Sequence, residues 1–310
     1  AGYHIVGEGL NARAEITDFW AMVFNPSFMD RLLHVWIGAF LAGSFLVISV
    51  HAYYLLKDRY VELSQKALKI ALMVATVSAV AQLATGHQSA DGVAENQPQK
   101  LAAFEGQYEA EKPMDLYLFG WVNKEKQEVK GIRIKGGTSF LVHWDFNEPV
   151  KGLNAFPPDE QPTAVNAIFQ FYHLMVAIGL LLIAITVYGT IQWWRGKVFY
   201  HRWYLWLLVF AVALPQISNQ LGWFAAEMGR QPWVVWGHLK TADALSESVT
   251  ASNVIFSLIF FTLIYILLLT LFIYLLDRKI RKGPYDESDI DNRLKLKDIA
   301  AQLDPDTPKK

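Results

Sequence analysis

Long apolar segments alternate with shorter polar segments along most of this 310-residue chain. A helix needs about 20 mainly apolar residues to cross a bilayer, because each residue adds about 1.5 Å along the axis. The segments that reach or approach this length are residues 32–56, 67–85, 164–194, 203–224 and 250–276. The pattern therefore predicts an all-α fold, a polytopic membrane bundle of five transmembrane helices.

The five segments differ in strength. Residues 67–85 form the shortest one, for which a buried helix of a soluble protein is the alternative interpretation. The last segment carries no charged residue from Val254 to Leu276 and is the strongest. Only the fourth segment is broken by a proline, Pro215, which lies among polar residues and would suit a transporter or a cofactor cavity.

Basic residues gather in the loops after the first, third and fifth apolar segments. They are Lys57, Arg59, Lys66, Lys69, Arg195, Lys197, Arg202, Arg278, Lys279, Arg281 and Lys282. All of them fall on one side of the predicted membrane, which the positive-inside rule makes cytoplasmic. We therefore expect the N-terminus outside and the C-terminus in the cytoplasm.

This orientation divides the chain into five regions. Residues 1–30 form an outward N-terminal segment, 31–85 the first two spans, 86–163 a long outward loop, 164–277 the last three spans and 278–310 a cytoplasmic tail. The chain begins with Ala-Gly-Tyr and shows no signal peptide. We therefore expect a processed, split or incomplete polypeptide that enters the membrane from outside.

Composition supports a membrane protein. Hydrophobic residues make up 53% of the chain and charged residues only 18%, against about 25% in soluble domains. The net charge of −1 gives no reason to expect nucleic acid as a partner. The absence of cysteine excludes disulfides, zinc–thiolate sites and thiol catalysis.

Two side chains in the predicted spans are candidate haem ligands. His34 lies in the first span and Met175 in the third, both in the outward halves. A His/Met pair is a known axial set for an electron-transferring haem. His173 lies two residues before Met175 and would face a haem propionate. The alternatives are a buried His that bonds to another helix and a Met that only packs.

A second candidate site lies at the end of the fourth span. Glu227 and Arg230 stand three residues apart beside an apolar helix, and ionisable groups there are often functional. Glu227 would ligate iron, Arg230 would pair with propionates, and Trp223 would stack on the macrocycle. The alternative is a simple ion pair at i,i+3 spacing.

Three motifs together resemble subunit I of the cytochrome bd quinol oxidases, over most of the chain and over spans five to nine of that family. The motifs are Asp-Arg-Leu-Leu-His at 30–34, Lys-Leu-Ala-Ala-Phe-Glu at 100–105 and Gly-Arg-Gln-Pro-Trp at 229–233. The resemblance implies that His34 and Met175 hold a low-spin haem b of the b558 type. It also implies that Glu227 belongs to a second haem b, of the b595 type.

The resemblance further implies that residues 86–163 form a quinol-binding loop, in which Lys100 orients a quinol oxygen and Glu105 accepts a proton. Without the resemblance, these two residues would be interpreted as a solvated charge pair. Oxygen would be reduced to water at a third macrocycle, haem d or haem b. The implied location is a bacterial or archaeal cytoplasmic membrane, in contact with lipid and quinol.

The family's first four spans, with a further haem-ligating His and proton-path carboxylates, have no counterpart here. We therefore expect a partner chain with about four such spans, and also a subunit II-like protein. One alternative is a quinone-reactive haem b membrane subunit of a complex that is not an oxidase. Another is a non-catalytic membrane scaffold or a transporter subunit.

Overall fold

The structure of the chain is a computed structural model that describes residues 1–7, 13–246 and 248–284. The chain divides into two compact units, Ala1–Leu245 and Ser246–Lys310, and each is described by itself. The predicted tail begins at 278, and its part from 285 to 310 lies outside the described residues.

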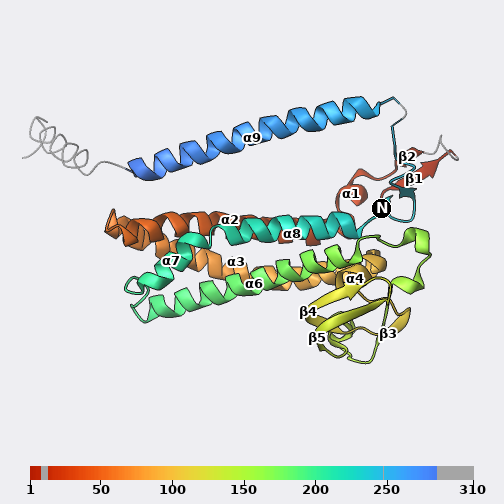
Figure 1. Ribbon diagram of the computed structural model, residues 1–310, viewed down its shortest axis with the longest axis horizontal. Coiled ribbons are helices and arrows are strands. Elements are labelled where there is room, and N and C mark those ends of the chain that lie inside the picture. The colour runs from red at the N-terminus through yellow and green to blue at the C-terminus, as the bar shows by residue number, and fades with distance from the viewer. Residues whose placement is uncertain (8–12, 247, 285–310) are drawn as a thin grey trace, which may run out of the picture. The chain divides into compact units, whose positions relative to one another are not determined.

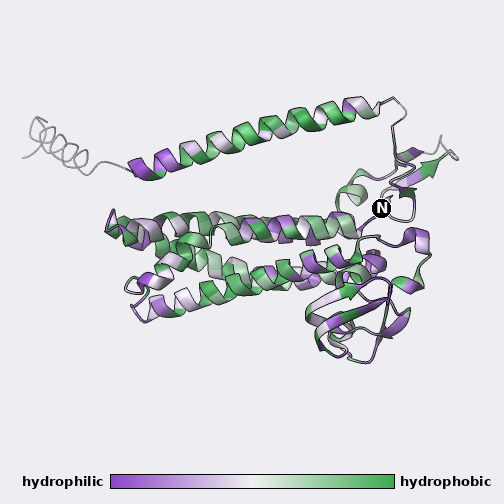
Figure 2. Cartoon of the chain, viewed as in Figure 1, coloured by the Kyte–Doolittle hydropathy of each residue, from purple (hydrophilic) through white to green (hydrophobic). Residues whose placement is uncertain are grey.

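Five helical spans among the described residues are long and apolar enough to cross a membrane, which confirms the predicted fold class. They are α2 (Phe28–Leu56), α3 (Val61–Asn96), α6 (Val165–Trp194), α7 (Arg202–Phe210) with α8 (Ala213–Gly229), and α9 (Ala251–Lys282). Figure 2 shows that hydrophobic residues dominate the middle of these helices. The fourth span is split because Pro215 lacks the amide hydrogen that a continuous helix would donate to Ala211.

Helix α9 makes up most of the described part of the second unit. None of its 32 residues is buried. Its N-terminus is capped by Thr250, whose side chain accepts a hydrogen bond from the Asn253 amide. Its last turn carries Lys279, Arg281 and Lys282, whose positive charges suit the negative end of the helix dipole.

In the first unit, the other four spans pack into a bundle. Helix α2 lies against α3 and α7, and α6 lies against α3 and α8. Figure 1 shows α4 and the strands β3, β4 and β5 at one end of this bundle, which we call the loop end. We call the opposite end, where α2 and α6 finish at Leu56 and Trp194, the basic end, because Lys57 and Arg195 follow there.

Helix α3 is longer than the hydropathy pattern predicts. The apolar segment ends at Thr85, yet the helix continues through the polar residues 86–96. Hydropathy reports the part of a helix that suits lipid, whereas this extension, which contains two glycines, is held by tertiary contacts, among them the hydrogen bond from Gln88 to Asp30 at 2.7 Å and packing against α4. The expected loop over 86–163 therefore begins with eleven helical residues.

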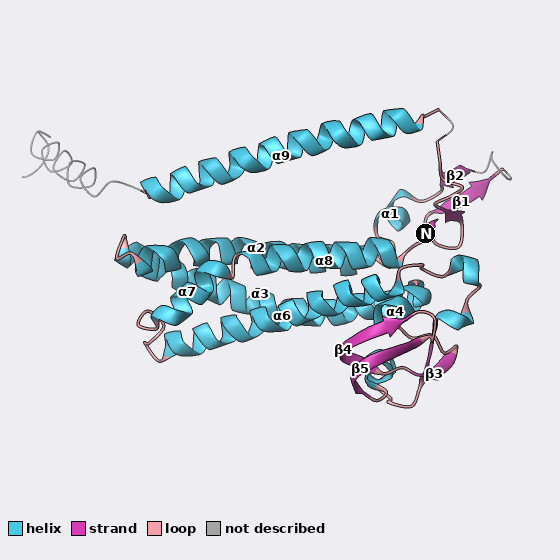
Figure 3. Ribbon diagram, in the orientation of Figure 1, coloured by secondary structure: helices cyan, strands magenta, loops and turns pink. Residues whose placement is uncertain are grey.

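The rest of this region is also structured (Figure 3). It contains the helices α4 (Pro98–Glu105) and α5 (Gly137–His143), the strands β3 (Glu111–Pro113), β4 (Leu116–Asn123), β5 (Glu128–Ile134) and β6 (Pro149–Lys151), and the 3-10 turns η2 (Leu153–Ala155) and η3 (Pro158–Glu160). Strands β4 and β5 form an antiparallel hairpin, and β3 pairs with β6. Helix α4 ends at Gly106, whose φ of 67° suits glycine and whose missing Cβ leaves room for Val122 and Val129.

Two further short hairpins complete the described fold. Strand β1 (Tyr3–Val6) pairs with β2 (Arg13–Ile16) and is followed by α1 (Phe19–Val23). Strand β7 (Trp233–Val235) pairs with β8 (Leu239–Lys240) directly after α8. The predominantly helical fold thus carries small antiparallel sheets, which the all-α prediction did not include.

Candidate functional site

The bundle has two hydrophobic cores, with a layer between them in which no helix residue is buried. One core, at the basic end, contains the fully buried residues Phe45, Ile48, Leu68, Leu72 and Tyr204. The other, at the loop end, is built around α4 and the start of α6. Between them lies what we call the open layer: residues 28–37 of α2, 80–96 of α3, 170–177 of α6 and 216–224 of α8, none of which is buried. The residues of the open layer therefore keep part of their surface exposed in this unit.

His34 lies in the open layer and is held by α3. Its Nδ1 is 3.1 Å from the Thr85 hydroxyl, which itself donates to the carbonyl of Ala81 at 3.2 Å. The amide nitrogen of Gln82 lies 3.2 Å from Nδ1 and 2.9 Å from Nε2 of His34. Thr85 and Gln82 of α3 thus hold the imidazole in place, as residues behind a metal ligand do.

Met175 lies in the same layer, on the other side of the bundle. Its Sδ packs against α8, at 2.6 Å from the place where a Cβ of Gly222 would stand. His34 is thus held by the α2–α3 pair and Met175 by the α6–α8 pair. An imidazole and a thioether from separate helices fit the donor set of a low-spin haem.

His173 lies beside the loop region. Its Nδ1 donates to the carbonyl of Phe169 at 2.9 Å, and its Nε2 is 3.8 Å from an Oε2 of Glu105. Neither of the two facing atoms has a hydrogen-bond partner. The structure therefore brings His173 together with Glu105, a pairing that the sequence did not predict.

Lys100 and Glu105 are both buried, with 6% and 3% of their surface exposed. The alternative of a solvated charge pair is therefore wrong. Burial and, to a smaller extent, the positive charge of Arg31 lower the pKa of Lys100 to about 8. Burial raises the pKa of Glu105 to about 8. Both groups can therefore exchange protons near neutral pH.

The side chains of Lys100 and Glu105, both on α4, contact different neighbours. Lys100 lies against Gly229 at the end of α8, where an added Cβ would be 3.2 Å from its Cγ. Glu105 faces His173 and the Thr138 hydroxyl at the start of α5. Between them, the ring of Phe104 stacks on Tyr172 with centroids 4.6 Å apart. The helix thus presents two separate polar positions.

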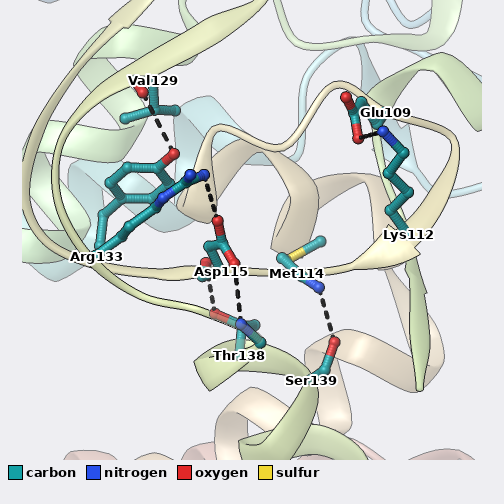
Figure 4. Close-up of polar contacts among 10 residues, drawn as sticks. Glu109, Lys112, Met114, Asp115, Val129, Arg133, Thr138 and Ser139 are labelled. Carbon is teal, nitrogen blue, oxygen red and sulfur yellow. Dashed lines mark hydrogen bonds and ion pairs between the residues drawn. The ribbon is translucent and has the colours of Figure 1, made fainter. Parts of the chain in front are cut away.

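A polar network around Asp115 fixes the start of α5 (Figure 4), whose Thr138 interacts with Glu105. The Asp115 carboxylate accepts hydrogen bonds from the Gly136 amide at 2.9 Å and from Arg133 at 2.6 Å. The Thr138 hydroxyl donates to the Asp115 carbonyl at 3.2 Å, and the Met114 amide donates to the Ser139 hydroxyl at 2.7 Å. These bonds fix the position of Thr138.

Glu227 and Arg230 form an ion pair, as their i,i+3 spacing predicted. The guanidinium Nε and Nη2 lie 2.8 and 2.7 Å from Oε2 of Glu227. Trp223 is 67% exposed. The charges of Arg31, Glu227 and Arg230 all act on the pKa of Lys100. The predicted second site is thus a charged corner beside α4.

Sequence reasoning missed Gln82, Thr85 and Thr138. The sequence did indicate Gln82 and Thr85, because polar residues three apart in an apolar segment lie on one face of a helix. It did not indicate Thr138, since the place of this residue depends on the fold of the loop.

Comparison with known proteins agrees with this architecture. The family model described as cytochrome bd terminal oxidase subunit I matches residues 1–284. The putative cytochrome bd menaquinol oxidase subunit I of Bacillus subtilis is 37% identical over 295 residues, covering 93% of this chain and 64% of the relative. The cytochrome bd ubiquinol oxidase subunit 1 of the same species is 30% identical, covering 88% and 60%.

A solved structure of the bd oxidase from Geobacillus thermodenitrificans superposes with a TM-score of 0.81 at 32% identity, covering 92% of this chain and 64% of that chain. The chain thus spans somewhat less than two thirds of the length of these proteins. Since the family model covers nearly the whole chain and the fold agrees, the chain belongs to the cytochrome bd terminal oxidase subunit I family.

Proposed function

We propose that this chain is a haem-binding membrane subunit of a quinol:oxygen oxidoreductase, and that it oxidises quinol at the loop end. The observation that carries the proposal is the burial of Lys100 and Glu105 in one short helix beside the open layer that contains His34 and Met175. The printed names of two relatives, a menaquinol and a ubiquinol oxidase subunit, support this substrate class.

Quinol oxidation releases two protons and two electrons, so the site needs a group that binds an oxygen and a group that takes a proton. Lys100 orients a quinol oxygen through its ammonium group. Glu105 accepts a proton, and a pKa of about 8 is close to the operating pH that proton transfer favours. Because the two side chains face different neighbours, they have separate tasks.

His34 and Met175 would hold a low-spin haem b in the open layer. Such a haem, when bound, supplies a one-electron redox centre whose potential is raised by the Met ligand. Thr85 and Gln82 would orient the His34 imidazole, and Gln82 would give up its contact with Nε2 if that nitrogen ligated the iron. Nε2 of His173 faces Oε2 of Glu105 at 3.8 Å, which is longer than a hydrogen bond.

Glu227 would serve a second haem b, with Trp223 on its face and Arg230 turned from Glu227 to the propionates. The third macrocycle, haem d or haem b, needs residues from the remaining length of a subunit I. That part belongs either to the same polypeptide or to a partner chain of about four spans. A subunit II-like protein completes the complex, in a bacterial cytoplasmic membrane with the loop end outside.

Reduced-minus-oxidised absorption spectra of the purified complex test this function. His34→Ala and Met175→Leu each remove the low-spin haem signal, because each removes an axial ligand. His51→Ala, near the basic end, and Met73→Leu, at a half-exposed position of α3, are matched controls that keep it. A normal low-spin signal in both ligand variants would contradict the haem assignment. Haem without oxygen uptake would favour the non-oxidase alternative, and a complex without haem the scaffold.

A further inference from the structure

The β7–β8 hairpin follows the charged corner in the chain and is held together by its own contacts. Trp233 pairs with Lys240, whose ammonium group lies 5.4 Å from the centre of the Trp233 ring. The hairpin is closed by Thr241, which donates to Gln231 through its hydroxyl at 2.7 Å and to the Pro232 carbonyl through its amide at 2.8 Å. These bonds make the hairpin a defined element rather than a loose connection.

On one side, the hairpin is fixed to the charged corner. Arg230 donates to the carbonyl of Val234 at 3.2 Å, while it also pairs with Glu227. Any movement of the hairpin would therefore act on the Arg230 guanidinium.

On its other side, the hairpin is fixed to α4 and to the turn η3. The indole Nε1 of Trp236 donates to Oε1 of Gln99 at 2.9 Å, and Lys240 pairs with Asp159. Gln99 directly precedes Lys100 and is only 2% exposed. Its amide nitrogen donates to the Glu160 carbonyl at 3.4 Å, so Gln99 links the hairpin, α4 and η3.

The two links differ in strength. Lys240 and Asp159 form an exposed ion pair, and such pairs contribute little. The Trp236–Gln99 bond satisfies a buried amide oxygen, which would lose its partner if the indole N–H were removed. The Trp236–Gln99 bond is therefore the link that holds the first turn of α4.

We propose that Trp236 and Gln99 are positioning residues, which hold Lys100 in register with the Glu227–Arg230 corner. This inference rests on the proposed quinol oxidation at α4. Helix α4 packs closely against the end of α8, since a Cβ added at Gly229 would lie 3.1 Å from the Phe104 ring and 3.2 Å from Cγ of Lys100. A shift of the first turn of α4 moves the ammonium group away from the quinol oxygen that it binds.

The test is steady-state quinol oxidation by the purified complex. Trp236→Phe removes the N–H donor but keeps an aromatic ring, so we expect the KM for quinol to rise about fivefold, the size of one hydrogen bond, with a much smaller change in kcat. Trp194→Phe, at an exposed tryptophan of the basic end, is the matched control with an unchanged KM. Gln99→Met removes the acceptor and gives a similar rise.

The double variant separates a specific bond from general damage. If Trp236 and Gln99 act through one bond, Trp236→Phe combined with Gln99→Met raises KM no further than either change alone. Additive effects, or a KM equal to that of the control while the wild-type complex oxidises quinol, would overturn this inference and leave the proposed function intact. A wild-type complex without quinol oxidation overturns both. Haem spectra and kcat stay close to those of the wild type throughout, even where the lost bond lowers the thermal midpoint slightly, and a rise confined to KM is what a merely structural role would not predict.

Discussion

The two ends of the four-span bundle are packed differently. At the basic end, the chain fills its own interior with large apolar side chains such as Phe45, Ile48 and Leu72, all fully buried. Towards the loop end, the same helices bury no residue over several turns, and polar groups such as Gln82, Thr85 and His34 occupy the space. The first pattern is a close-packed core, whereas the second is a layer of partly exposed residues with polar side chains among them.

The candidate functional groups of this bundle lie towards its loop end. Buried polar groups without partners gather near the loop end, including Oε2 of Glu105, Nε2 of His173 and Oε1 of Gln82. Such groups are costly unless a ligand or a reaction uses them.

The largest expected effect concerns α4. Lys100→Gln and Glu105→Gln each lower quinol turnover about 100-fold, because loss of a group that binds or takes a proton in the reaction typically costs that much. Haem content measured by absorption stays the same. The exposed pair Lys112 and Glu109, 2.7 Å apart and also shown in Figure 4, offers matched controls, since the same substitutions there leave turnover unchanged. Normal turnover in both α4 variants would remove the proposed site.

The second prediction uses pH. The Glu105 carboxyl has a pKa of about 8 in the fold and about 4.5 when unfolded, so the folded state keeps a proton that the unfolded chain loses. Stability therefore falls as pH rises from about 4.5 to about 8, by at most about 5 kcal/mol. Glu105→Gln has no such group, so its thermal midpoint exceeds that of the wild type at pH 8 and approaches it near pH 5. Equal midpoints at both values would mean that Glu105 is not held protonated.

The third prediction probes the packed end. A Cβ at Gly189 would lie 2.0 Å from the hydroxyl of Tyr204, a fully buried side chain that donates to the Ile185 carbonyl at 2.8 Å. Gly189→Ala therefore lowers the stability by about 3 kcal/mol, through overpacking and a broken buried bond. Thermal denaturation measures this loss, and the haem spectrum does not change. Gly179→Ala, with nothing within 4 Å of the new Cβ, is the control.

The spans were predictable because the bilayer imposes a minimum apolar length, and residues 164–194 matched α6 within one residue. The end of α3 was not predictable from hydropathy, because the residues after Thr85 are mostly polar and yet helical. The burial of Lys100 was hidden as well. Nothing in a short polar helix indicates that the residues around it, from β4 to α8, will cover it.

The candidate site was predictable in part. His34 and Met175 stood out as rare ligand types in apolar segments, and the Glu227–Arg230 pair followed from helix geometry. The contact of His173 with Glu105 and the bond from Trp236 to Gln99 join residues that are 68 and 137 positions apart. Such contacts depend on tertiary folding, which local sequence patterns do not determine.

The smallest expected effect contrasts the open layer with the packed end through one more glycine. A Cβ at Gly222 would lie 2.6 Å from Sδ of Met175, which is the end of a flexible side chain rather than a fixed ring. In Gly222→Ala the thioether turns aside, so stability falls by less than about 1 kcal/mol. If Met175 is an axial ligand, however, its weaker bond lowers the midpoint potential of the low-spin haem. Redox titration of this variant beside Gly43→Ala, whose new Cβ meets nothing within 4 Å, measures the shift. A potential equal to that of the control, together with a loss of stability as large as that of Gly189→Ala, would show that this layer is packed like the basic end.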